Sequence, residues 1–205
     1  MPNIILLGPP ASGKGTQCQL ILKEQDLACL GTGQILREEV SSGSELGLEI
    51  ESYLNRGAYV PDQLIMEMVF QWLKTQGAND WLLDGFPRTL AQAEALETQG
   101  YSPDLVIGIE VAQSALEDRI LSRLVCSSCG ATHSRKVVGD APCPDCGGEL
   151  QVRSDDGIEN FRNRYKNYQE LTLPLYDFYE SKGLLHRVDG NLAPAEVFEQ
   201  VRKVL

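Results

Sequence analysis

Five short apolar runs punctuate the chain and are separated by longer stretches with a helical period. The runs are residues 3–8, 27–30, 81–85, 105–111 and, more weakly, 184–190. An unbroken apolar run of this length is typical of a strand that is buried on both faces of a sheet. We therefore predict five strands of a mainly parallel sheet.

Apolar positions recur every three or four residues between these runs. The predicted helices are residues 14–24, 33–41, 44–55, 62–75, 89–98, 113–124, about 157–182 and 194–204. Alternating strands and helices predict a doubly wound α/β domain. In such a domain, ligands bind beyond the carboxyl ends of the strands.

Two regions interrupt this alternation. Residues 31–60 contain helices with no strand before residue 81, and residues 122–156 hold turn residues and charges without a helical period. A chain of 205 residues suits one sizeable core with small insertions. We predict a core built from residues 1–30, 61–121 and 157–205, from which the other two regions project.

The composition limits the class of partner. A net charge of −11 opposes general attraction to DNA or RNA, so any bound anion must meet a local group of cations. The first apolar run ends after Leu7 without a basic leader, and no later run approaches the roughly 18 apolar residues that a membrane span needs. We expect a cytoplasmic protein without a membrane partner, and no exposed apolar stripe indicates anything other than a monomer.

A glycine-rich loop follows the first predicted strand and leads into a helix. Its sequence "GPPASGKGT", residues 8–16, fits G-x-x-x-x-G-K with Lys14 as the lysine. In this motif, backbone N–H groups, the helix N-terminus and the lysine ammonium surround phosphate oxygens. Gly15 stands where a hydroxyl usually follows the lysine, so we predict Thr16 as the ligand of magnesium or phosphate.

A second strand ends in a carboxylate. In "WLLDGFPR", Asp84 closes the run and is predicted to hold Mg²⁺ directly or through water beside the phosphate loop. A glutamate often follows this aspartate in enzymes that hydrolyse ATP. Gly85 cannot orient a water molecule, which favours transfer to a bound acceptor over hydrolysis.

Phosphoryl transfer also needs cations around the transferred group, and this acidic chain supplies arginines. The candidates are Arg37, Arg88, Arg119, Arg123, Arg153 and Arg164. The spacing of Arg119 and Arg123 predicts that both lie on one face of the helix 113–124. With two histidines in the chain, a histidine general base is disfavoured.

The cysteines fall into two groups. Cys126, Cys129, Cys143 and Cys146 form C-x₂-C-x₁₃-C-x₂-C, which predicts a tetrahedral and therefore structural Zn²⁺ site, although another thiophilic metal fits the same ligands. The segment has few apolar residues, so metal binding is expected to supply its folding energy. Cys18 and Cys29 are interpreted as small buried hydrophobic residues.

Several motifs occur together in one order: "GPPASGKGTQ", "TGQILR", "VPDQL", "DGFPRTLAQA", "RILSRL", "RSDDGIENFRNR" and "VDG". On these motifs the chain resembles the adenylate kinases of the bacterial long-lid form nearly end to end. The resemblance implies a P-loop fold with a five-stranded sheet, an AMP-binding domain at residues 31–60 and a lid at residues 122–156. It also implies Mg²⁺-dependent transfer from ATP to AMP, which gives two ADP.

The resemblance assigns residues to each ligand. The implied ATP contacts are Ala11, Ser12, Gly13, Lys14, Gly15, Thr16, Arg119, Arg123, Thr132, His133 and Leu192. The implied AMP contacts are Thr32, Arg37, Ala58, Tyr59, Val60, Gly85, Phe86, Pro87, Arg88, Gln92, Arg153 and Arg164. The implied catalytic set is Lys14, Asp84, Arg88, Arg123, Arg153 and Arg164.

The chemistry of Gln92 agrees with this assignment. Its amide has donors and an acceptor that complement the amino group and ring nitrogen of adenine. Arg88, four residues earlier on the same predicted helix, is expected to reach the phosphate of that nucleotide. The chain departs from the family at Gly31 and Gln34, which removes a side-chain cap from the helix that follows, and at Leu192.

Two other functions stay open on the sequence. The first is a kinase of another nucleoside monophosphate, against which Thr32 and Gln92 favour adenine. The second is a P-loop protein whose zinc ribbon reads nucleic acid. The net charge, Gly85 and the presence of only Arg135 and Lys136 as cations between the cysteine pairs oppose the second.

Overall fold

A computed structural model describes residues 2–205 and contains the predicted parallel sheet. Its five strands follow the order β2-β3-β1-β4-β8, and all four pairings are parallel. The strands are β1 (Ile4–Leu7), β2 (Ala28–Gly31), β3 (Trp81–Asp84), β4 (Leu105–Glu110) and β8 (Leu185–Asp189). The α/β class and the five strands are confirmed.

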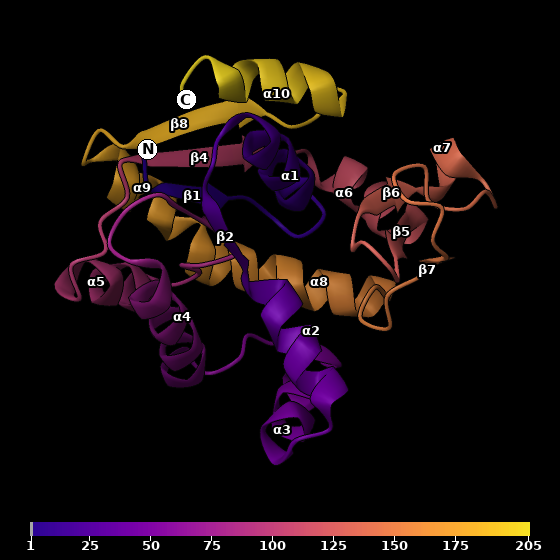
Figure 1. The fold of residues 1–205 in the computed structure, drawn as a ribbon, viewed down its shortest axis with the longest axis horizontal. Helices are drawn as coiled ribbons and strands as arrows, with labels where there is room; N and C mark the ends of the chain where they lie inside the picture. The colour runs from indigo at the N-terminus through magenta and orange to yellow at the C-terminus, as the bar shows by residue number, and fades with distance from the viewer. Residues whose placement is uncertain (1) are drawn as a thin grey trace.

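Helices cover both faces of this sheet (Figure 1). They are α1 (Lys14–Glu24), α2 (Thr32–Ser42), α3 (Glu45–Leu54), α4 (Asp62–Gln76), α5 (Leu90–Thr98), α6 (Gln113–Ser122), α8 (Ile158–Asn167), α9 (Pro174–Glu180) and α10 (Pro194–Arg202). Alternate residues of β1 explain the two layers. Ile5 and Leu7 pack with α4, α5 and α9, whereas Ile4 and Leu6 pack with α1 and α10.

The strand register brings the chemically interesting residues to one edge of the sheet. Leu6 pairs with Asp84, which in turn pairs with Gly31 on the other side. The loop after β1, the loop after β3 and the start of α2 therefore meet at the carboxyl ends of three neighbouring strands. This edge is where an open α/β sheet binds its ligands.

Helices α2 and α3 form the predicted excursion at residues 31–60 and extend away from the sheet (Figure 1). Gly31 occupies the N-cap of α2 without a side-chain cap, as the sequence predicts. In contrast, Ser44 caps α3, because its Oγ accepts from the Gly47 N–H at 2.8 Å. A side chain at Gly47 would collide with the Glu39 carbonyl, so glycine permits the close packing of the two helices.

Three asparagines of α8 hold the end of this excursion. Asn160, Asn163 and Asn167 donate from their side-chain amides to the carbonyl oxygens of Leu54, Arg56 and Gly57, at 2.9, 3.1 and 3.0 Å. These backbone acceptors leave the last turn of α3, where carbonyl groups lack helical partners. Helix α8 therefore fixes the base of residues 31–60 from across the molecule.

The cysteine segment, residues 122–156, contains regular structure that the sequence pattern did not predict. It folds as a small antiparallel sheet of β5 (Arg123–Cys126), β6 (Thr132–Ser134) and β7 (Leu150–Gln151), with the short helix α7 (Arg135–Val138). Figure 1 shows it projecting from the sheet-and-helix core. Its strands have two to four residues, which is too short for an alternating pattern to stand out.

Two predicted helices differ from the structure. The prediction that helix 113–124 carries Arg123 is wrong, because α6 ends at Ser122 and Arg123 begins β5. The predicted helix 157–182 is interrupted by a π-helical turn, η1 (Tyr168–Thr172), between α8 and α9. This turn lets the Thr172 Oγ1 donate to the Arg88 carbonyl at 2.9 Å.

Across residues 2–205, none of the helices combines the length and the apolar character that crossing a bilayer requires.

The central strands predict a measurable cost of core truncation. Leu83 of β3 is fully buried, so Leu83→Ala should lower the free energy of unfolding by roughly 2–5 kcal/mol. Leu121 is 64% exposed, and Leu121→Ala is the matched control, with an expected change within about 0.5 kcal/mol. Urea unfolding followed by the fluorescence of Trp72 and Trp81 measures both. Equal losses in the two variants would contradict the described core.

Candidate active site and metal centre

The loop after β1 closes around the ammonium group of Lys14. Gly8 and Gly13 have φ values of +154° and +98°, and a side chain at Gly8 would meet Ser12 Oγ at 2.8 Å. Lys14 Nζ donates to the Gly8 carbonyl oxygen at 2.8 Å and to the next carbonyl at 2.9 Å. Burial lowers the pKa of this ammonium to about 8, although a nearby carboxylate opposes the shift. The loop therefore holds a buried cation whose charged form would be stabilised by a bound anion.

Strand β3 brings Asp84 beside the first turn of α1. One oxygen of Asp84 lies 3.5 Å from the position that a side chain at Gly15 would take. Gly85 follows with φ +83°, and a side chain there would meet Thr32 Oγ1 at 2.7 Å. Thr32 Oγ1 instead donates to the Gly85 carbonyl oxygen at 2.9 Å. Gly15 and Gly85 thus leave room beside the carboxylate and beside Thr32.

Six cations gather around three carboxylates at this edge of the sheet, and we call them the cation cluster. The cations are Lys14, Arg37, Arg88, Arg123, Arg153 and Arg164, and the carboxylates are Asp84, Asp155 and Asp156. Burial, together with repulsion from neighbouring arginines, lowers the pKa of Arg153 and of Arg164 to about 10. The excess positive charge fits a ligand with several phosphate groups.

The arginines of the cation cluster come from separate elements and share two buried aspartates. Arg123, from β5, donates two hydrogen bonds to Asp156: its Nε donates to one carboxylate oxygen at 2.7 Å, and a terminal guanidinium nitrogen donates to the other oxygen. Arg164, from α8, donates to Asp155 at 3.2 Å. The Nε of Arg153 is buried and has no partner among the described residues. An anion that reaches Arg153 would give this donor its missing partner.

Arg119 lies apart from this group. Its guanidinium donates to the Gly190 carbonyl oxygen at 2.6 Å and to the Ser12 carbonyl oxygen at 3.3 Å. It therefore joins the phosphate loop to the turn after β8. The prediction that Arg119 and Arg123 share a helix face is wrong, because the chain changes from helix to strand between them.

Two hollows adjoin at the cation cluster. The first, the phosphate pocket, is lined by Leu6, Leu7, Gly8, Pro10, Lys14, Tyr59, Gly85, Pro87, Arg88, Arg164 and Thr172. The second, the acceptor pocket, is lined by Thr32, Leu36, Tyr59, Val60, Ile65, Gly85, Arg88 and Gln92. Tyr59, Gly85 and Arg88 line both hollows, and the Arg88 guanidinium lies 5.1 Å above the Tyr59 ring. Two ligands, one in each pocket, can thus place their polar ends side by side at Arg88.

Gln92 lines the acceptor pocket and is 2% exposed. Its Oε1 accepts from the Arg88 N–H at 2.7 Å, and its Nε2 donates to Asp62 at 2.6 Å. Thr89 also donates to Asp62, at 2.8 Å, and its Oγ1 caps helix α5. The prediction that Arg88 lies on the helix of Gln92 is wrong, since α5 begins at Leu90. Arg88 occupies the loop before the helix.

Some predicted contacts lie outside the two pockets. Ala58 contributes no lining atoms, Phe86 is buried in the core, and Leu192 is 41% exposed after β8. Thr132 lies on β6 of the cysteine segment. His133 Nε2 lies 3.4 Å from Cys143 Sγ, so its ring is directed toward the cysteines and not into open solvent.

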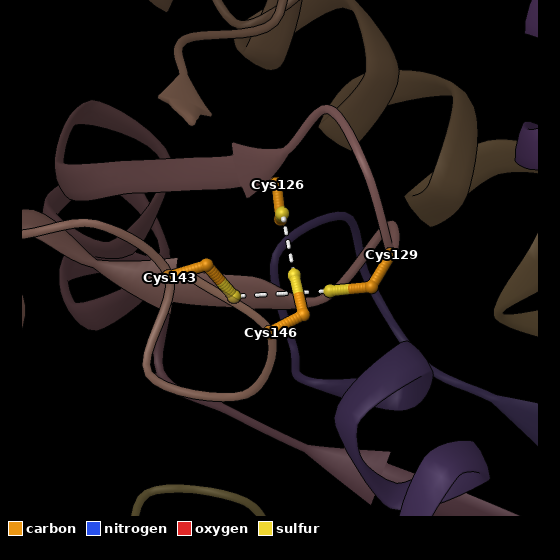
Figure 2. Close-up of side chains that lie close together, drawn as sticks. All are labelled: Cys126, Cys129, Cys143 and Cys146. Carbon is orange, nitrogen blue, oxygen red and sulfur yellow. Dashed lines mark hydrogen bonds between the residues drawn. The ribbon is translucent and has the colours of Figure 1, made fainter. Parts of the chain in front are cut away.

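The four cysteines converge from two turns of the cysteine segment (Figure 2). Their sulfur atoms all lie within 4.8 Å of one another, with Cys129 and Cys143 at 3.7 Å and Cys126 and Cys146 at 3.4 Å. Cys126 and Cys143 are buried, whereas Cys129 and Cys146 are exposed. Four sulfur ligands in this arrangement fit a tetrahedral metal site.

The backbone around the cysteines supports the same interpretation. The glycines that directly follow Cys129 and Cys146 have φ values of +72° and +75°. Backbone N–H groups, that of Cys129 first, lower the pKa of the Cys126 thiol to about 6. Despite a backbone hydrogen bond from Ala131, hydrogen bonds with the other cysteines raise the pKa of the Cys129 thiol to about 12, so without metal the four sulfur atoms share their protons unequally. A thiolate is the form that binds metal. The residues present therefore fit Zn²⁺.

Four residues that complete the site were not predicted from the sequence. Asp155 and Asp156 neutralise the arginines, Asp62 holds Gln92, and Thr172 connects the Arg88 loop to η1. Both aspartates occur in the motif "RSDDGIENFRNR", and Asp62 occurs in "VPDQL". For the three aspartates, the signal was a carboxylate two or three positions after a residue already assigned to the site, whereas Thr172 had no such signal.

Known proteins resemble this chain over nearly its whole length. A family model described as adenylate kinase matches residues 6–184. The adenylate kinase of Caldanaerobacter subterraneus subsp. tengcongensis is 42% identical over 211 aligned residues, which cover 99% of this chain and 96% of the relative.

Two further relatives agree. The adenylate kinase of Carboxydothermus hydrogenoformans is 40% identical, with 99% of each chain covered. That of Desulforudis audaxviator is 42% identical over 92% of each chain. With a matching family model over most of its residues and relatives of this similarity, the chain belongs to the adenylate kinase family.

Proposed function

We propose that the two adjoining pockets bind Mg·ATP and AMP end to end and that the chain transfers the terminal phosphoryl group directly to AMP, giving two ADP. Family membership makes the chain a phosphotransferase of the nucleoside monophosphate kinase class. The observation that carries the proposal is the pair of pockets that share Arg88, Gly85 and Tyr59 within the cation cluster. This arrangement suits two nucleotides that meet at their phosphates.

The acceptor pocket suits a nucleoside monophosphate. Leu36, Val60 and Ile65 offer apolar contacts to a base, and Gln92 supplies an amide at the same wall. To bind a base, the Gln92 amide must give up its hydrogen bonds with the Arg88 N–H and with Asp62 and form new ones with the edge of the base. This favours a base with the matching donor and acceptor. Arg88, at the mouth shared with the phosphate pocket, is positioned for the monophosphate.

The donor side is proposed to use residues 11–16. Backbone N–H groups of this loop and Lys14 surround the outer phosphates, and Arg119 approaches the ATP from the turn after β8. We assign Thr16 and Asp84 to the Mg²⁺ that enters with ATP, which neutralises phosphate charge. Thr132, His133 and Leu192 complete the proposed ATP contacts from the cysteine segment and the β8 turn.

The arginines are proposed to stabilise the charge of the transferring group. Arg88, Arg123, Arg153 and Arg164 surround the position where the two nucleotides meet, and Arg37 approaches from α2. Asp155 and Asp156 hold the guanidinium groups in place before substrate binds, so little rearrangement is needed during transfer. Positioning and charge neutralisation together are enough for in-line transfer without a covalent enzyme intermediate.

We propose the same division of the chain as the sequence indicates. Residues 31–60 act as the AMP-binding domain and residues 122–156 as a lid over ATP. A lid that carries Arg123 and Arg153 at its base both excludes water and completes the cation cluster. Zn²⁺ on Cys126, Cys129, Cys143 and Cys146 has only a structural role, since four thiolates leave no open coordination position.

The cellular setting is also part of the proposal. We infer a monomer in the cytoplasm that acts on free nucleotides without a nucleic-acid or membrane partner. The six free thiols suit a reducing compartment, and the cations converge on an internal site in a chain of net charge −11.

Substrate choice tests the function and the role of Gln92. With Mg·ATP as donor, the chain should phosphorylate AMP far faster than CMP, UMP or GMP in a coupled assay of ADP formation. Gln92→Ala should raise the KM for AMP at least tenfold, because the base loses its polar partner and Arg88 loses a support. Gln99→Ala, at the exposed end of α5, is the matched control. A preference for another monophosphate overturns the assignment to AMP.

The low pKa of Lys14 predicts proton uptake on binding of the donor. Without a ligand, the Lys14 side chain is mostly the neutral amine near pH 9, because its pKa is about 8. Bound phosphates raise this pKa again. Binding of a non-hydrolysable Mg·ATP analogue should therefore take up on the order of one proton at pH 9 and far less at pH 7.5. Calorimetry in buffers of different ionisation enthalpy measures the uptake. Lys14→Arg, which stays charged at both pH values, should abolish the difference.

Metal removal should unfold the cysteine segment before the core. Its only described apolar cluster is Cys126, Ala131 and Cys143 with Leu150, so the metal contributes most of the folding free energy. Chelation or Cys129→Ser should speed trypsin cleavage after Arg135 and Lys136, because these surface residues are held in α7 while the segment is folded, at temperatures where Trp72 and Trp81 fluorescence stays native. Unchanged resistance to trypsin after zinc loss would be the opposite result, and Ser127→Ala serves as a neighbouring control.

A further inference from the structure

The two cysteines outside the metal site meet in the core. Cys18 lies on α1 and Cys29 on β2, eleven residues apart in sequence. Their sulfur atoms are 2.7 Å apart, and each is the polar partner of the other. The sequence interpretation of two separate buried hydrophobic residues therefore misses a pair.

We propose that Cys18 and Cys29 form a redox-modification site, in which a peroxide converts the two thiols to a reversible disulfide that ties α1 to β2. A disulfide needs a sulfur separation of about 2.05 Å, so a movement of roughly 0.7 Å closes the gap. Both residues sit on elements already packed together through the shared cluster of Ile4, Leu6, Ile21 and Leu82. The backbone thus holds the sulfur atoms together without a large change of fold.

The surroundings assign a different role to each thiol. Cys18 is 6% exposed, whereas Cys29 is partly exposed and is the thiol that a small oxidant reaches first. A hydrogen bond with Cys29, followed by burial, raises the pKa of the Cys18 thiol. Because Cys18 is shielded from the oxidant and its sulfur lies against that of Cys29, Cys18 acts second, as the resolving thiol.

The reaction balances with hydrogen peroxide as the oxidant. The Cys29 sulfur attacks one peroxide oxygen, the O–O bond breaks, and a sulfenic acid and one water form. The Cys18 sulfur then attacks the Cys29 sulfur and passes its proton to the departing hydroxyl, so the S–O bond breaks and a second water leaves. Two electrons move from the sulfur atoms to the peroxide, and a small thiol reverses the bond by exchange.

The position of the bond matters for the site. Cys18 follows the phosphate loop by one helical turn, and Cys29 precedes Thr32 by three residues. A covalent link here joins the helix of the phosphate loop to the strand that leads into residues 31–60. The cross-link also lowers the conformational entropy of the unfolded chain, which stabilises the folded core.

Peptide mapping of the full-length, zinc-loaded protein tests the proposal. After treatment with hydrogen peroxide, trypsin should release peptides 15–23 and 24–37 as one linked species with two hydrogen atoms fewer than the separate pair. Dithiothreitol should separate them. The lid cysteines lie in other tryptic peptides, 124–135 and 137–153, so their oxidation is scored independently. Linked protein should melt roughly 5 °C higher than reduced protein.

Cys18→Ala and Cys29→Ala are the paired controls, and each should remove both the link and the shift in melting temperature. A variant that folds poorly is replaced by alkylation of the native protein, in which blocked Cys29 must prevent the link. Recovery of both peptides unlinked after oxidation overturns the proposal. So does a linked protein that melts below the reduced one, because the native arrangement would then not accept the bond.

Discussion

Electrostatic compensation at the sheet edge is the constraint on which the rest of the structure depends. Six cations, each from a different element or loop, lie together with three carboxylates, and burial lowers the pKa values of several of these cations. Such a cluster is costly without anions, since partly desolvated like charges repel. Asp155 and Asp156 hold the arginines in the absence of ligand, and bound phosphates supply the remaining negative charge.

The two excursions follow from this constraint. Arg37 comes from the helices of residues 31–60, Arg123 and Arg153 come from the base of the cysteine segment, and Arg164 comes from α8, which contacts both. The same helix fixes residues 54–57 through three asparagines. A movement of either excursion therefore changes the cation cluster, so the proposed closure over the substrates would also complete the charge environment.

The cysteine segment shows how a small unit gains rigidity without a hydrophobic core. Its apolar cluster has few members, and its strands are short. Four converging sulfur atoms, with glycines in left-handed conformations after two of them, replace the missing burial once metal is bound. Arg123 lies on the strand that leads directly to Cys126, so the metal also orders one of the arginines of the site.

The sequence by itself determined the sheet, most of the helices, the phosphate loop and the four cysteines of the proposed metal site. These features depend on local spacing: continuous apolar runs, a glycine-rich loop before a lysine, and cysteine pairs two residues apart. Only the tertiary structure decided that Arg123 begins a strand, that Arg88 precedes its helix, that Asp155 and Asp156 face the arginines and that Cys18 meets Cys29. Each of these features depends on groups from different elements. Packing and the pairing of distant charges bring these groups together, and neither effect produces a periodic pattern in the sequence.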